Sequence, residues 1–77
     1  MYNLITIQIL KNSPTARSML AYNTYDEAIS ALYMTMASAS ANIEVTSCVC
    51  TILSDDGSLN KQEIWERFQD NPVEDAE

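Results

Sequence analysis

Histidine is missing from this chain of 77 residues, and cysteine, glycine and proline are scarce. Without histidine, nucleophilic catalysis lacks its usual general base. The two cysteines, Cys48 and Cys50, are too close in sequence to close a useful loop, which excludes a cysteine-rich secreted scaffold. A Cys-x-Cys pair also supplies only half of the ligands of a closed zinc site. We therefore expect no enzymatic activity, no metal and no cofactor.

Basic side chains are also few, since 4 Lys and Arg stand against 11 Asp and Glu, for a formal net charge of −7. Such a chain repels nucleic acid and anionic membranes, and it suits basic partners. The acidity also has a simpler explanation, which is solubility. The sequence has no apolar run long enough to span a membrane and no signal-peptide pattern at its start. We expect a cytoplasmic protein without direct nucleic-acid or membrane contact.

The segment Tyr25–Ala41 predicts a helix, and its start is marked by Thr24 and Glu27 at capping-box spacing. Apolar residues at helical spacing predict its core stripe, and Asn42 is a candidate left-handed stop. After Asp26 and Glu27 the segment carries no charge. The predicted stripe consists of Ala28, Ile29, Leu32, Met36 and Ala39.

Alternating or β-branched residues predict strands at Tyr2–Leu10, Ala16–Tyr22 and Ile43–Leu53. In the third, Val45, Val49 and Leu53 should share one face, and Cys48, Cys50 and Ile52 should share the other. The segment 54–57 predicts a turn that uses the only glycine, Gly57. Leu59–Phe68 fits a returning strand, with a helix as the alternative.

The expected fold is α+β, with order ββαββ: a four-stranded antiparallel sheet with one helix on one face. Residues 1–68 should form the single domain, and the acidic segment 69–77 should be a disordered tail. A domain this small is marginally stable, which favours a homo-oligomer, either a dimer or a higher assembly. One helix covers only one face of the sheet, so the second face should contact water or a partner.

The candidate interface residues are Met34, Thr35 and Ser38 on the uncharged helix, and Trp65 in the last segment. Trp65 and Ile64 should point to opposite faces, one into the core and one toward a partner. The candidate ligand-binding residues are Lys11, Arg17 and Tyr22, which could hold a small anionic molecule at a subunit interface.

Four stretches carry a resemblance to a known group: residues 7–12, 25–28 and 47–53, and the Glu63-x-Trp65 step. With these, the chain resembles short proteins carried by prophages and mobile elements of gut Firmicutes. The resemblance covers most of residues 2–68 and brings no catalytic residues. It implies mobile-element biology, in which short acidic proteins bind and disable host machinery.

Three functions follow from these observations. The first is a small acidic homo-oligomer that associates with and inhibits a basic host protein, as an anti-defence factor of a mobile element. The second is an oligomeric sponge that sequesters a small anionic ligand, such as a nucleotide, at its subunit interfaces. The third is a structural phage component.

Overall fold

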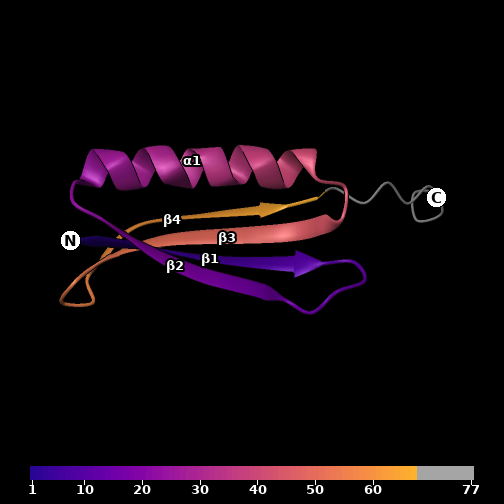
Figure 1. Ribbon diagram of the computed structural model, residues 1–77, viewed down its shortest axis with the longest axis horizontal. Coiled ribbons are helices and arrows are strands. Elements are labelled where there is room, and N and C mark those ends of the chain that lie inside the picture. Colours follow the sequence, from indigo (N-terminus) through magenta and orange to yellow (C-terminus); the bar gives the residue numbers. More distant parts are fainter. Residues whose placement is uncertain (68–77) are drawn as a thin grey trace, which may run out of the picture.

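The computed structural model describes residues 1–67 and contains four strands and one helix in the order ββαββ (Figure 1). The elements are β1 (Tyr2–Leu10), β2 (Ala16–Tyr22), α1 (Tyr25–Ala41), β3 (Val45–Ser54) and β4 (Leu59–Glu66). The α+β prediction with one helix is confirmed, and the segment after Gly57 is a strand, not a helix. Phe68 and the predicted tail, residues 69–77, lie outside the described residues. Within residues 1–67, no helix has both the length and the hydropathy to cross a membrane.

The strands form one antiparallel sheet in the order β2-β1-β3-β4. Strand β1 therefore lies inside the sheet, which agrees with its apolar residues on both faces. Helix α1 packs against one face only, above the central strands, and the opposite face has no covering element among residues 1–67 (Figure 1).

Both ends of α1 have identifiable hydrogen bonds. At the start, the Glu27 amide donates to the Thr24 hydroxyl at 3.2 Å, and the Thr24 amide donates to the Glu27 carboxylate at 3.4 Å. The predicted capping box is thus confirmed. The predicted left-handed stop at Asn42 is wrong, because its φ is −99°. The chain instead stays extended toward β3, and the Asn42 amide donates to Ala39.

The core between α1 and the sheet is small. Its buried hydrophobic residues are Leu4, Ala28, Leu32, Ala39, Val45, Cys48, Cys50 and Ile52. The predicted helix stripe largely agrees, with Ile29 and Met36 packed at its margin. Four of the eight core side chains are alanine or cysteine, so helix and sheet bury little bulky apolar surface between them.

Val45 lies on a different face from the one its position in the sequence suggests. It is buried with Cys48 in the core, not beside Val49 on the opposite face. The reason is a bulge: Ile9 pairs with Ser47, whereas the next residue, Leu10, pairs with Val45. The extra residue between them reverses the alternation at the start of β3.

Candidate functional site

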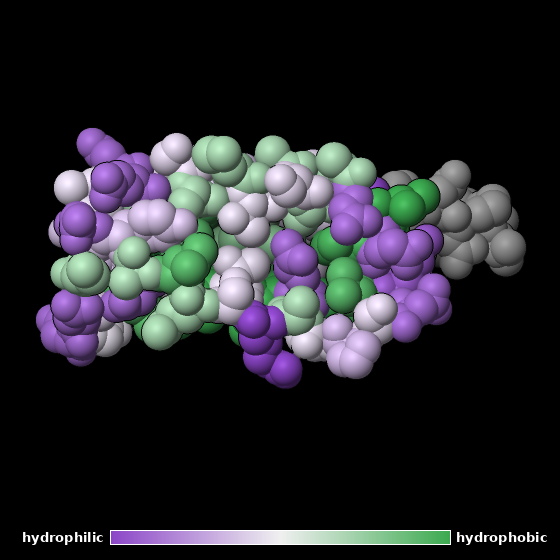
Figure 2. Space-filling view, viewed as in Figure 1, coloured by the Kyte–Doolittle hydropathy of each residue, from purple (hydrophilic) through white to green (hydrophobic). Residues whose placement is uncertain are grey.

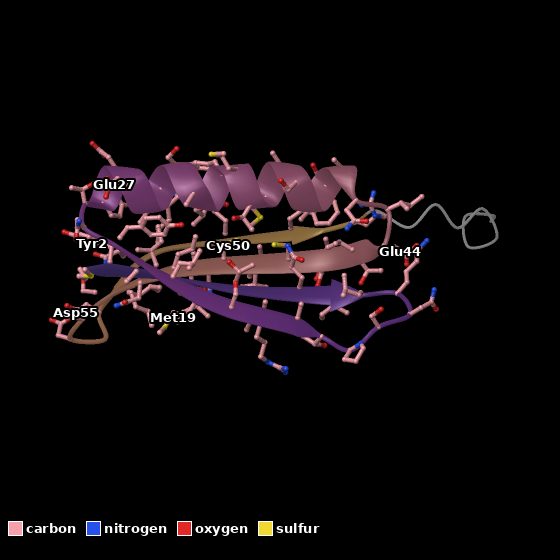
Figure 3. All side chains as sticks on the ribbon, viewed as in Figure 1. Tyr2, Met19, Glu27, Glu44, Cys50 and Asp55 are labelled. Atoms are coloured by element: carbon pink, nitrogen blue, oxygen red, sulfur yellow. The ribbon has the colours of Figure 1, made fainter. Side chains whose placement is uncertain are left out.

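The uncovered face of the sheet is an extended apolar surface of the described chain. Leu4 and Thr6 lie under the helix, so alternation places the intervening residues of β1 on the opposite face. Strand register then assigns the large apolar residues of this open face: Ile5, Ile7, Ile9, Met19, Val49, Leu53, Leu59 and Ile64. Figure 3 shows the contrast between Met19, which points away from the helix, and Cys50, which lies beneath it.

Large apolar residues lie on both faces of the sheet. On the covered side, the buried Leu4, Leu32, Val45 and Ile52 are joined by partly buried aromatic and aliphatic side chains at the margin of the core. The open face has eight large apolar residues, of which Ile9, Met19 and Ile64 are 49%, 63% and 62% exposed. Isolated apolar residues on a surface need no explanation, but a contiguous patch of this kind marks a contact surface.

Two charged residues of the strands belong to the open face, Arg17 on β2 and Glu66 on β4. They stand on the two outer strands of the sheet, with the apolar residues of β1 and β3 between them. The strands therefore contribute no net charge to this face, although the whole chain has a formal charge of −7.

A second surface lies between α1 and the edge strand β2, which turns away from the helix (Figure 1). An open hollow of about 570 Å³ is lined by Tyr22, Glu27 and Met34 among others. A smaller one of about 180 Å³ is lined by Ser18, Leu20 and Thr35 among others. Figure 2 shows this side, with hydrophilic residues gathered at the two ends of the molecule and a paler, more apolar band between them.

The predicted helix interface residues lie together along this band. Met34 is 67% exposed, Ser38 is exposed, and the Thr35 hydroxyl donates to the Ala31 carbonyl at 2.8 Å. Helical spacing places Ser38 beside Met34 and Thr35. Their uncharged flank borders the hollow beside β2, so it remains a candidate contact surface.

The predicted ligand-binding residues are not brought together within one protomer. Lys11 follows the end of β1, whereas Tyr22 ends β2 at the opposite end of the sheet. Arg17 pairs with Ile7, so its side chain belongs to the open face, while Tyr22 packs against the core beneath α1. A shared anion site would need residues from a second protomer.

Trp65 belongs to the helix side of β4, where it packs against the core opposite Cys48. Its neighbour Ile64 is the residue that faces outward. Trp65 also stacks under the Arg67 guanidinium, whose carbon lies 4.9 Å from the ring centroid. Its indole is therefore committed to contacts within the protomer.

Arg67 holds the end of α1 against the start of β3. Its Nε donates to the Val45 carbonyl at 3.1 Å, and one terminal nitrogen donates to the Ser40 and Asn42 carbonyls at 3.3 and 2.9 Å. The last carbonyls of a helix lack partners within the helix, and a cation there also opposes the negative end of the dipole. Sequence reasoning left Arg67 as one of four scattered cations, because these contacts span more than twenty residues.

Replacing Arg67 with alanine should lower the free energy of unfolding by about 2 kcal/mol, because three carbonyls lose a charged donor and Trp65 loses its stacking partner. Urea denaturation at a fixed protein concentration measures this loss. The control is Lys61→Ala on β4, whose exposed cation pairs with Glu63 and lies over the Tyr33 ring, so its removal should have a much smaller effect. Equal effects of the two substitutions would contradict the role assigned to Arg67.

Cys48 and Cys50 are buried free thiols under α1, with sulfur atoms 3.8 Å apart. Burial raises the pKa of the Cys50 thiol to about 11, and the adjacent Cys48 adds to this. Nucleophilic and metal-binding cysteines need the opposite shift, toward the thiolate. The part of the chain that the structure describes contains no cluster of three metal-ligating side chains. The pair thus packs as small apolar residues.

Acidic residues gather at one end of the molecule. Glu27 at the start of α1 and Asp55 in the turn after β3 lie at this end, and Glu44 lies at the other (Figure 3). Asp26 precedes Glu27 in the sequence, and Asp56 follows Asp55. A hydrogen bond from Asn3 lowers the pKa of Asp55, and the Ser58 amide lowers that of Asp56. Asp55 and Asp56 therefore stay ionised well below neutral pH.

Comparisons with protein-family models, with curated proteins and with solved structures found no match for this chain, so its function is argued from its own surfaces.

Proposed function

We propose that this protein is a small acidic homo-oligomeric binding protein of the cytoplasm that associates with and inhibits a basic host protein. The observation that carries the proposal is the uncovered apolar face of the sheet. The resemblance of the chain to short mobile-element proteins makes the protein a candidate anti-defence factor. It acts by association and not by catalysis.

Two separate surfaces support the two kinds of contact in this proposal. The open face, with its eight large apolar side chains, serves association of the protein with itself. The acidic end, with Asp26, Glu27, Asp55 and Asp56, remains accessible for a basic partner. Opposite charge speeds the encounter of two proteins and makes their association sensitive to salt.

The alternative function, sequestration of a small anionic ligand, finds less support. The larger hollow beside β2 is lined by the Glu27 carboxylate, which repels an anion, and by no lysine or arginine. The smaller hollow is lined by one cation, Arg17, whose side chain the register assigns to the open face. Lys11, Arg17 and Tyr22 do not converge within a protomer. Protein association is therefore the better use of the surfaces that are present.

The test is capture of host proteins on the immobilised protein at two salt concentrations. At about 0.1 M salt we expect basic proteins to be retained, and at about 1 M salt we expect them to be lost, because the Debye length falls from about 10 to about 3 Å. The homo-oligomer should persist at both concentrations, since apolar contacts are not screened. Retention that is the same at both concentrations would contradict the proposal.

A pair of variants locates the acidic surface. Asp55→Asn with Asp56→Asn removes two charges at the acidic end and preserves the oxygen that accepts from Ser58. Glu44→Gln with Glu63→Gln removes the same charge elsewhere and serves as the matched control. We expect the first pair to lower retention roughly tenfold and the control to have little effect.

A further inference from the structure

We propose that a second copy of this chain packs its open sheet face against the first, with a two-fold axis parallel to the strands, and forms a two-layered sandwich of sheets. The inference deepens the proposed function and rests on its homo-oligomer. It specifies which surface forms the interface and how the two copies are arranged.

The large side chains of the open face favour a second sheet as its cover. Burial against a second sheet is the environment in which β-branched residues alternate along strands, as they do at Ile5, Ile7 and Ile9. No element among residues 1–67 covers this face. A single protomer therefore leaves exposed the kind of side chain that sheet-on-sheet packing buries.

The charge of the face favours a copy of the same chain over a basic partner. Arg17 and Glu66 balance each other, and at the rim Asp55, which accepts from Asn3, is paired with the N-terminal amine at 3.3 Å. A basic protein would find no attraction here. Two copies of this face can meet without the repulsion expected from a charge of −7 per chain.

The position of these two charges selects the axis. Strand register places Arg17, Ile7, Val49 and Ile64 in one row across the sheet, and Glu66 two residues beyond Ile64. A two-fold axis parallel to the strands lays β2 over the partner's β4. Arg17 then lies over the edge that carries Ile64 and Glu66. Packed sheets are about 10 Å apart, a gap that arginine and glutamate side chains together span.

The same axis also matches side-chain sizes. It lays β1 of one copy over β3 of the other, so Ile5, Ile7 and Ile9 face the positions of Thr51, Val49 and Ser47. Large residues thereby meet smaller ones, which is how two layers interdigitate. An axis perpendicular to the strands would instead lay β1 over β1 and oppose isoleucine to isoleucine.

The extent of the face is adequate for a dimer. Four strands spaced about 4.8 Å apart, and about eight residues long at about 3.3 Å per residue, give roughly 500 Å² in projection per copy. Two such faces bury roughly 1,000 Å² in projection, the area that a biological interface should reach. The accessible area is larger than this projection, because the side chains make the surface uneven.

The test compares Ile64→Lys with Met34→Lys by sedimentation velocity on the full chain. Both residues are more than 60% exposed in the protomer, at 62% and 67%, so neither substitution disturbs the core. We expect the wild type and Met34→Lys at twice the chain mass of 8.6 kDa, and Ile64→Lys at the mass of one chain. Circular dichroism should show the same helix in all three.

Charge exchange tests the axis without touching an apolar residue. Arg17→Glu and Glu66→Arg should each weaken dimerisation roughly tenfold, because two contacts per dimer become repulsive. The double variant should restore the wild-type affinity, since the charges are complementary again.

Three results would overturn the inference. A dimer that survives Ile64→Lys but is lost in Met34→Lys would place the interface on the helix, and the homo-oligomer of the proposed function would stand. Charge variants without mutual rescue would refute the axis. A wild type that is monomeric at all concentrations would overturn both this inference and the homo-oligomer.

Discussion

Leu32→Ala is expected to destabilise the protein by about 3 kcal/mol or more, the largest loss from any single truncation in the core. Leu32 is fully buried at the centre of α1, against a sheet whose nearest buried residues include Cys48 and Cys50. These small neighbours cannot move in to fill the space of a lost isobutyl group, so the cavity remains. For a domain of this size the melting temperature should fall by roughly 15 °C.

The control for this substitution is at Met34, half a turn along α1 from Leu32. Met34→Ala, on the exposed side of the same helix, should change the free energy of unfolding by about 0.5 kcal/mol or less. Both are measured by urea denaturation at one protein concentration, because association couples stability to concentration. If the two alanine variants were equally stable, the packing of α1 on the sheet would be refuted.

Local sequence signals were sufficient for the elements of this fold. The capping box at Thr24 and the glycine turn at Gly57, whose φ is 91°, depend on residues within a few positions of each other. The same is true of period-two alternation in β1. Each of these signals reflects a local requirement of the backbone, and the tertiary contacts agree with it.

Features that depend on pairing across the sheet were not predictable. The face of Val45 is decided by a bulge in its register with Leu10, which no local pattern encodes. Ile64 and Trp65 are both apolar, so alternation alone could not decide which of them faces the helix. The helix ending beside Asn42 likewise depends on Arg67, which lies 25 positions later in the sequence.

The candidate site was predicted in part. The sequence indicated that one helix would leave a sheet face open, and that β1 would be apolar on both sides. It directed attention to the helix residues Met34, Thr35 and Ser38, because an uncharged helix is conspicuous in sequence. The open face is harder to see, because it is assembled from single residues of four strands and becomes contiguous only through register.

Cys50 should react with iodoacetamide at least a hundredfold more slowly in the folded protein than in the unfolded chain. The thiolate is the reacting form, and burial raises the pKa of this thiol from 9.0 to about 11. At pH 8 such a shift lowers the thiolate fraction about a hundredfold. The covering helix lowers the rate further, because the reagent must wait for an opening of the structure.

Mass spectrometry of alkylated Cys48→Ala measures Cys50 alone, since no other cysteine remains. In this variant the pKa of Cys50 stays raised by burial, its largest cause, and loses the part that Cys48 adds. Labelling should be slow at pH 8, rise with pH, and become fast in guanidinium chloride. Leu32→Ala supplies an internal comparison, because its lower stability should increase the rate of labelling through more frequent opening. Rapid labelling of the native protein would mean that Cys50 is an accessible, charged nucleophile. That outcome would reopen the catalytic and metal-binding functions that its burial argues against.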